Sequence, residues 1–205
     1  MSITNEYRGR SIPGLPTTTS EIVAICRQNG CGNKGMIYSH NGSPTAYIKY
    51  GPRDGVPEGE MPTQLHAYNV FRNMKVSGLK IPEIYHAFER FEDQVKEPVI
   101  YIIMEYVHGQ TVQAAMKTDS SQDKNHILDQ VAKAVKQLLM IPPPNGLLLG
   151  PVQRGHIYHP LFTDDGASEK YKSVDHVQRH FNKVFTLNLA LSLHLHLSHN
   201  RFLRE

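Results

Sequence analysis

The feature that most constrains the fold of this chain is an apolar run from Val99 to Met104, bounded by Pro98 and Gly109. The run is rich in β-branched residues, which favour strands over helices. A strand with one face in water alternates apolar and polar residues, so a run this apolar predicts a strand covered on both faces. It is far shorter than the ~18 residues that a membrane span needs. Other elements must therefore pack on both sides of this strand.

The composition favours a globular protein and narrows its partners. Of 205 residues, 40% are hydrophobic and 20% charged, which supports a packed core rather than disorder. The 22 Lys and Arg exceed the 19 Asp and Glu by only +3, without a basic block, so a dedicated nucleic-acid binder is not indicated. Two cysteines, Cys26 and Cys31, favour a reducing compartment, and residues 1–16 contain no apolar segment typical of a secretory signal. We expect a cytoplasmic protein that binds neither nucleic acid nor a membrane.

The pattern of residues along the chain predicts an α+β fold. Residues 1–20 are expected to be irregular because glycines and prolines interrupt them, and Ser20 is expected to cap a short helix over 21–25. An Asn-Gly turn at 41–42 is typical of a hairpin. The further expected elements are strands 36–38, 45–50, 81–88 and 99–104, and helices 60–75, 123–139 and 173–183. This order gives a small antiparallel sheet with one inserted helix, followed by the start of a helical domain.

Three glycines, Gly30, Gly32 and Gly35, match the pattern G-x-G-x-x-G. In a dinucleotide-binding unit such glycines follow a strand and open a helix, whereas here they precede a strand. That position is typical of a flap over nucleotide phosphates, where missing side chains let backbone N–H groups approach the oxygens. The alternative is a flexible turn without a ligand.

Lys49 lies inside the otherwise apolar strand 45–50. An ammonium group needs a partner there, because burying an unpaired charge is costly. Glu60, at the start of the next helix, is the expected carboxylate partner. We expect Gly30 to Gly35 to cap a hairpin whose second strand carries Lys49, and Glu60 to face this lysine from the helix. The alternatives are a solvent-facing lysine on an edge strand and an ordinary carboxylate of a first helical turn.

Taken together, these segments resemble the small lobe of the aminoglycoside phosphotransferase and choline-kinase-like branch of the protein-kinase-like fold, especially its fungal members. The resemblance spans residues 21–183 and includes the beginning of the family's helical large lobe. It implies an irregular N-terminus at 1–20, a small lobe and hinge at 21–107, a partial large lobe at 108–183 and an unrelated tail at 184–205. The segments that carry it are 30–35, 46–51, 60–64, 81–88, 102–109, 127–141, 150–152 and 159–162.

The resemblance also implies a binding site for ATP. Gly30, Gly32 and Gly35 would cover the phosphates, Lys49 would neutralise the α- and β-phosphates, and Glu60 would orient Lys49. Glu60 is preferred to Glu58 because it begins the pattern E-x-x-T-Q. At the adenine, Met104 would form the back of the pocket, with the Glu105 carbonyl and the Val107 amide at the base edge.

The catalytic part of the family pattern is missing. Neither His156 nor His159 begins an H-x-D-x-x-x-x-N loop, and Asp164 to Gly166 comes too early to supply the magnesium aspartate. No residue is therefore assigned to catalysis or to a metal, although the family uses Mg²⁺. From Leu187 to Leu197 leucines alternate with Ala190 and polar residues, and this period of two predicts a strand. Because leucine is not a preferred strand former and the run exceeds the usual ~5–6 residues, we interpret it as the product of a shifted reading frame or a retained intron. A zinc site at His194, His196 and His199 is a weaker alternative, since no Cys or acidic residue joins them.

The resemblance thus implies a kinase-like protein descended from an ATP-dependent phosphotransferase that acts on a small-molecule hydroxyl. We expect weak ATP binding and no catalysis by the chain as it stands. The alternative is a non-catalytic pseudokinase module that binds a nucleotide or a partner. The phosphoryl acceptor cannot be inferred, because its contacts would come mainly from the missing part of the large lobe.

Overall fold

The computed structural model describes residues 3–30, 34–52, 59–74, 78–91, 98–118, 121–144, 167 and 170–183. By contacts, the chain divides into two compact units, Met1–Asn145 and Gly146–Glu205. The predicted hinge at 104–107 therefore lies inside the first unit. None of the helices in the described ranges has the length and apolar character needed to cross a membrane. The elements of the first unit are β1 (Ile3–Arg8), α1 (Thr19–Gln28), β2 (Lys34–His40), β3 (Ser43–Pro52), α2 (Glu60–Met74), β4 (Ile84–Phe91), β5 (Pro98–Glu105), α3 (Val112–Thr118) and α4 (Ser121–Leu139).

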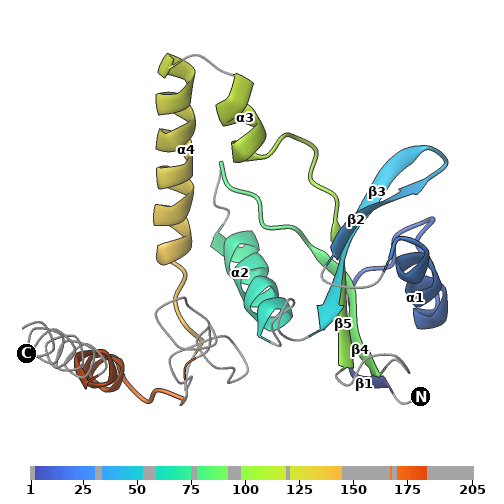
Figure 1. Ribbon diagram of the computed structural model, residues 1–205, viewed down its shortest axis with the longest axis horizontal. Coiled ribbons are helices and arrows are strands. Elements are labelled where there is room, and N and C mark those ends of the chain that lie inside the picture. Colours follow the sequence, from blue (N-terminus) through green and yellow to red (C-terminus); the bar gives the residue numbers. More distant parts are fainter. Residues whose placement is uncertain are drawn as a thin grey trace, which may run out of the picture. The chain divides into compact units, whose positions relative to one another are not determined.

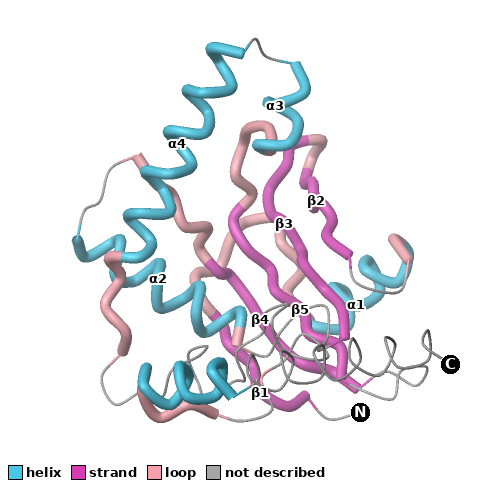
Figure 2. The backbone as a smooth tube through the Cα atoms, turned by 60° about the vertical axis from the view of Figure 1, so that its left-hand side comes forward, coloured by secondary structure: helices cyan, strands magenta, loops and turns pink. Residues whose placement is uncertain are grey.

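The first unit is built around a five-stranded antiparallel sheet in the order β1-β4-β5-β3-β2, whose strands are drawn in magenta in Figure 2. α1 and α2 cover opposite faces of this sheet (Figure 1). On the α1 face, Tyr101 and Ile103 of β5 join a buried cluster with residues of α1. On the α2 face, Ile102 and Met104 join a second cluster, against which Met61 and Leu65 of α2 pack. The prediction of a central strand covered on both faces is confirmed, and so is the α+β class.

Most of the expected elements are present, with shifted ends. The Asn-Gly turn joins β2 to β3, and Asn41 adopts the positive φ of 52° that such a turn requires. β4 begins at Ile84 rather than at Ile81. Strand 99–104 is extended by one residue at each end in β5, and helix 60–75 corresponds to α2.

The prediction that residues 1–20 are irregular is wrong for the first part of this segment. Ile3–Arg8 forms β1, an edge strand that pairs antiparallel with β4. An edge strand takes its hydrogen bonds from a single distant neighbour, so its short, polar sequence carries little strand signal by itself.

The cap of α1 also differs from the prediction of Ser20. Thr18 is the N-cap: its hydroxyl accepts a hydrogen bond from the Glu21 N–H, while the Glu21 carboxylate accepts from the Thr18 N–H. This reciprocal arrangement satisfies two backbone donors, because the carboxylate lies three residues beyond the capping hydroxyl. The same spacing does not exist from Ser20, where residue 23 is valine.

α4 forms where the apolar pattern of residues 127–139 predicts a helix; Ile127 and Val131 are half-buried, and other apolar side chains of the helix are exposed. Leu128, Val135, Leu138 and Leu139 are 50%, 47%, 40% and 81% exposed. Periodicity reports that a helix has an apolar face, and it does not report whether another element covers that face.

In the second unit, the structure describes one short helical segment. Residues 174–183 are helical, which agrees with the helix expected at 173–183. Tyr171 and Ala167 are buried, and Val177 and Phe181 pack against them. The predicted leucine strand, the histidines at 156, 159, 194, 196 and 199, and the acidic pair at 164–165 lie outside the described residues.

β1 is held to β4 by side chains as well as by the strand ladder. Glu6 Oε1 accepts hydrogen bonds from His86 Nε2 on β4 and from Arg8 Nε, each at 2.8 Å. The bond from His86, together with the contact to Arg8, lowers the pKa of the Glu6 carboxyl below its ordinary value. Glu6 should therefore contribute stability above its unfolded-state pKa of about 4.3 and lose that contribution as the pH falls through its lower folded-state pKa.

We predict that Glu6→Gln lowers the free energy of unfolding at pH 7 by up to about 1 kcal/mol, because the site is partly exposed. Urea unfolding of both proteins between pH 7 and pH 3 measures this. The difference should shrink toward the acidic end, where the wild-type carboxylate takes up a proton. A difference that grows as the pH falls would contradict the assignment.

The central position of β5 leads to a second prediction. Ile102 is 0% exposed between β3 and β4, so Ile102→Ala should lower the free energy of unfolding by about 2–5 kcal/mol. Ile37→Ala on the edge strand β2 is the matched control, since Ile37 is 49% exposed and the change should cost less than about 1 kcal/mol. Equal losses in urea unfolding of the two variants would show that β5 is not the centre of the core.

Candidate functional site

The alternation of β3 places Lys49 on the α2 face of the sheet. Ile48 and Tyr50, its two neighbours, are 0% and 3% exposed and belong to the cluster on the α1 face. Successive strand residues point to opposite faces, so Lys49 and Tyr47 lie on the other side, facing α2. Lys49 is half-buried there.

Lys49 and Glu60 form a two-pronged ion pair. The Lys49 ammonium lies 2.6 Å from Glu60 Oε1 and 2.7 Å from Oε2. Glu60 is the first residue of α2, and the structure thus brings together the two residues that the spacing paired. Glu58 lies outside the described residues.

Packing rather than the ion pair fixes the position of α2. Met61 and Leu65 pack against the cluster on this face, and the Gln64 amide donates to the Pro82 carbonyl at 2.9 Å. The Lys49 and Glu60 side chains remain 34% and 26% exposed. A pair with this much solvent contact contributes about 0–1 kcal/mol to folding. The pair is therefore a charged group held in place by the fold, with little effect on stability.

Of the three glycines, Gly35 lies beside Lys49, in β2. Gly35 is the cross-strand neighbour of Lys49 in the β2–β3 ladder. A Cβ at position 35 would lie 1.7 Å from the Tyr47 hydroxyl, so the absence of a side chain is what lets the Tyr47 ring lie over β2. Gly30 has a positive φ of 105°, and its carbonyl accepts a hydrogen bond at 3.0 Å from Tyr50, which belongs to the cluster on the α1 face and not to the face of Lys49. Gly32 lies outside the described residues.

The expectation that Gly30 to Gly35 caps the hairpin is wrong in one respect. The turn that closes the β2–β3 hairpin is Asn41–Gly42, and Gly35 lies at the other end of the hairpin, near the start of β2. The reason is that two residues with positive φ suffice for the tight turn, and Asn-Gly provides them. The register nevertheless sets Gly35 beside Lys49.

Sequence reasoning missed Tyr47. Its ring is half-buried beside the cluster on the α2 face, two residues before Lys49 on the same side of β3. Its cross-strand neighbour in β5 is Met104. The available signal was the period of two itself, which puts residue 47 on the same face as the lysine.

The hinge residues lie at the end of β5, next to this face. Met104 is 8% exposed, and its sulfur accepts a weak hydrogen bond of 3.7 Å from Gln64. The Glu105 N–H donates to the Glu83 carbonyl at 2.8 Å, and its carboxylate lies 2.5 Å from the Lys80 ammonium. Val107, past the end of the strand, is 44% exposed. Tyr47 and Met104 link this end to Lys49 along one face of the sheet.

Among the described residues, no group of three or more His, Cys, Asp or Glu side chains is placed to hold a metal ion. Glu60 contributes a carboxylate to the site, and both its oxygens engage Lys49. The described part of the site thus contains the Lys49 ammonium, the Tyr47 ring and the backbone of β2 at Gly35.

Searches of protein-family models, of curated proteins and of solved structures found no match to this chain.

Proposed function

We propose that the first compact unit binds the phosphates and base of ATP in the manner of a kinase-like small lobe. The observation that carries the proposal is the Lys49–Glu60 ion pair, held on one face of the sheet opposite Gly35. A lysine oriented by a carboxylate on the following helix is what phosphate binding at this position needs. The small sheet with a single helix inserted between β3 and β4 supports the same assignment.

The phosphate end of the proposed site consists of Lys49 and the glycine segment. The ammonium keeps a third N–H donor beyond the two directed at Glu60, and its partial exposure leaves a phosphate oxygen room to approach. Gly35 lies beside Lys49 in the ladder, and the Tyr47 ring occupies the space that a side chain at position 35 would take, so this ring borders the phosphate end. Gly32 would cover the phosphates from the segment before this strand, whereas Gly30 is bonded to Tyr50 of the cluster on the α1 face.

The base end of the proposed site lies along the same face. The Tyr47 ring offers a surface on which adenine would stack, and Met104 would close the back of the pocket. Beyond them, the Glu105 carbonyl and the Val107 amide would meet the polar edge of the base. The side chains of Glu105 and Lys80 pair with each other and so leave this backbone as the recognition element.

Magnesium does not fit the residues that the structure describes, because they include no suitable cluster of ligands. We therefore assign no phosphoryl-transfer step to this chain. The proposal is binding by a protein descended from a phosphotransferase of small-molecule hydroxyl compounds, with an affinity in the millimolar range.

The binding proposal predicts that Lys49→Met weakens ATP binding by at least about tenfold, because one charge-assisted hydrogen bond is worth roughly 1.5–3 kcal/mol. The free energy of unfolding should change by less than about 1 kcal/mol, as for other exposed pairs. Titration calorimetry measures the first quantity and urea unfolding the second. Lys133→Met, an exposed lysine on α4, is the control and should leave ATP binding unchanged.

If wild type and Lys49→Met bound ATP with equal affinity, the proposal that this site binds ATP would be wrong. A large loss of stability in Lys49→Met would contradict the view that the pair serves a ligand rather than the fold. Glu60→Gln should give an intermediate loss of affinity, since the lysine remains but loses its orientation.

The missing catalytic loop leads to a prediction about turnover. Removal of a general base alone typically costs 10²–10⁴-fold in rate, about 3–5 kcal/mol. We therefore expect no ATP consumption above background when the purified chain is mixed with magnesium and a small alcohol or an aminoglycoside, measured by ADP formation. Turnover that disappears in Lys49→Met would overturn this expectation.

One observation favours the alternative of a partner-binding module. Leu128, Val135, Leu138 and Leu139 of α4 are exposed, and exposed apolar side chains of this kind are typical of a surface that meets another protein. This alternative and ATP binding differ in their dependence on Lys49, so the titration above separates them.

A further inference from the structure

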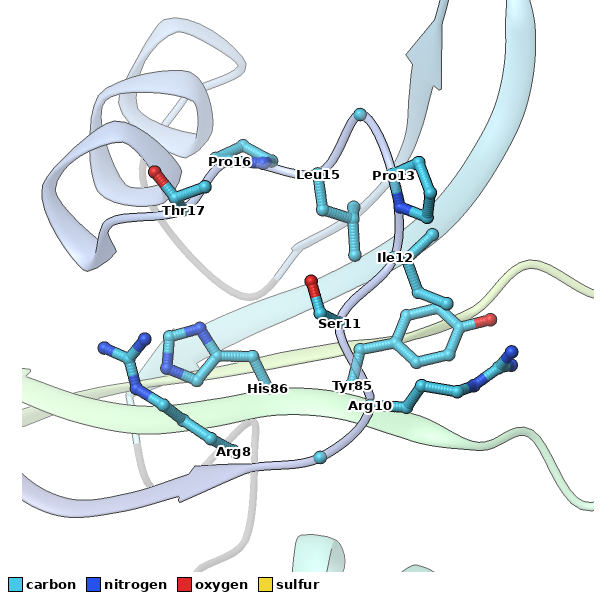
Figure 3. Close-up of a pocket in the computed structure, with 12 residues that line it drawn as sticks. Arg8, Arg10, Ser11, Ile12, Pro13, Leu15, Pro16, Thr17, Tyr85 and His86 are labelled. Atoms are coloured by element: carbon cyan, nitrogen blue, oxygen red, sulfur yellow. The ribbon is translucent and has the colours of Figure 1, made fainter.

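A second hollow lies on the opposite face of the sheet from Lys49. The segment from Gly9 to Thr17 leaves β1, crosses over β4 and leads into α1, and between it and β4 lies a cavity of about 360 Å³. This volume is at the lower end of the roughly 300–1,000 Å³ of small-molecule sites. Figure 3 shows the residues that line it.

A β-bulge in β4 supplies two adjacent side chains to this cavity. The register between β4 and β5 shifts between Ile84 and His86. Ile84 and Ala87 belong to the cluster on the α2 face, whereas Tyr85 belongs to the cluster on the α1 face. His86 lies on that same face, since its ring contacts Phe88 at 5.0 Å. A bulge of this kind re-aims a side chain, and here it brings both Tyr85 and His86 to the cavity wall.

One wall of the cavity carries nitrogen groups, from Arg8 and His86. Figure 3 shows the Arg8 and His86 side chains lying next to each other on one side of the space. Both are held by the same atom, Glu6 Oε1, through Arg8 Nε and His86 Nε2. Glu6 also contacts Arg8 Nη2, which leaves the Nη1 donors of the guanidinium for a ligand. The Ser11 hydroxyl points into the same space.

The facing wall is apolar and already ordered. Ile12 and Leu15 pack against the core cluster on the α1 face, and Leu15 points into the cavity in Figure 3. The Gly14 carbonyl accepts a hydrogen bond from Tyr38 at 3.0 Å, and the Leu15 N–H donates to the Ile12 carbonyl at 3.2 Å. Gly14 has a positive φ of 82°, and a Cβ there would lie 2.4 Å from the His40 ring. These contacts fix the segment, so a ligand would enter without ordering it first.

We propose that this cavity binds a small carboxylate with a compact apolar body, such as an aromatic or branched aliphatic acid. The carboxylate would accept hydrogen bonds from Arg8 and Ser11 beside His86, and the apolar part would lie against Ile12 and Leu15. A guanidinium suits a carboxylate because its donors form a planar fork. The site is separate from the one proposed for ATP, since the sheet lies between them.

Benzoate is the probe, and benzyl alcohol, which has the same ring without the charge, is its matched control. Amide NMR spectra of the full chain, titrated with millimolar benzoate, should shift at residues 8–17 and 85–86. Arg8→Gln should weaken benzoate at least fivefold, whereas Arg72→Gln, an exposed arginine on α2, should not. Ser11→Phe, which fills the cavity from an exposed position, should abolish the shifts while the remaining spectrum stays folded.

Three results would overturn the proposal: no shifts with benzoate, the same benzoate affinity in Arg8→Gln as in wild type, or equal affinity for benzyl alcohol and benzoate.

A titration with inorganic phosphate, which has a charge but no apolar body, separates the contributions of the two walls to affinity. Phosphate binding as tight as benzoate at these residues would show that the apolar wall contributes nothing, and would also count against the site. The ATP proposal rests on Lys49, on the other face of the sheet. If the chain did not bind ATP, the results expected for benzoate would not change.

Discussion

The burial of β5 on both faces is the constraint on which the first unit depends. Ile102 and Ile103 are successive residues with 0% and 2% exposure, and they point into different clusters. Each cluster excludes water only while a helix covers it, so α1 and α2 must pack on opposite sides of the sheet (Figure 1). Burial stabilises by roughly 25 cal/mol per Å² of apolar surface, or about 1.5–3 kcal/mol for one fully buried isoleucine side chain. One such side chain therefore contributes more to the free energy of folding than a partly exposed ion pair, which contributes about 0–1 kcal/mol.

The same constraint decides where the charged residues lie. β3 runs beside β5, and its Ile48 and Tyr50 are needed in the cluster on the α1 face. Because successive strand residues point to opposite faces, Lys49 must lie on the α2 face, where it meets the first turn of α2. The helix arrives there because Met61 and Leu65 pack on the sheet, and Glu60 comes with it. The proposed ligand site is thus a consequence of apolar packing, and its ion pair is available for function.

Local patterns in the sequence predicted what depends on neighbouring residues. The Asn41–Gly42 turn, the start of α2 at Glu60 and the buried strand β5 each follow from residues close in the chain, and the Lys49–Glu60 pair follows from their order. β1 was not predictable in this way, because its pairing with β4 joins residues about eighty positions apart. The exposure of apolar side chains on α4 could not be predicted either, because an amphipathic pattern does not tell whether another element packs against the apolar face. The kinase-like identity of the fold stays a prediction.

The bulge in β4 shows how one sheet can present two unrelated chemistries. A regular strand would send Tyr85 and His86 to opposite faces, and one of them would then enter the cluster that supports Met104 and α2. The extra residue removes this conflict: Ile84 and Ala87 keep their places on the α2 face, while both intervening side chains turn toward the segment 9–17. His86 can then meet Glu6 of β1, which ties the edge strand and positions Arg8 beside it. The local irregularity therefore fastens β1, shapes the cavity and leaves the face that carries Lys49 undisturbed.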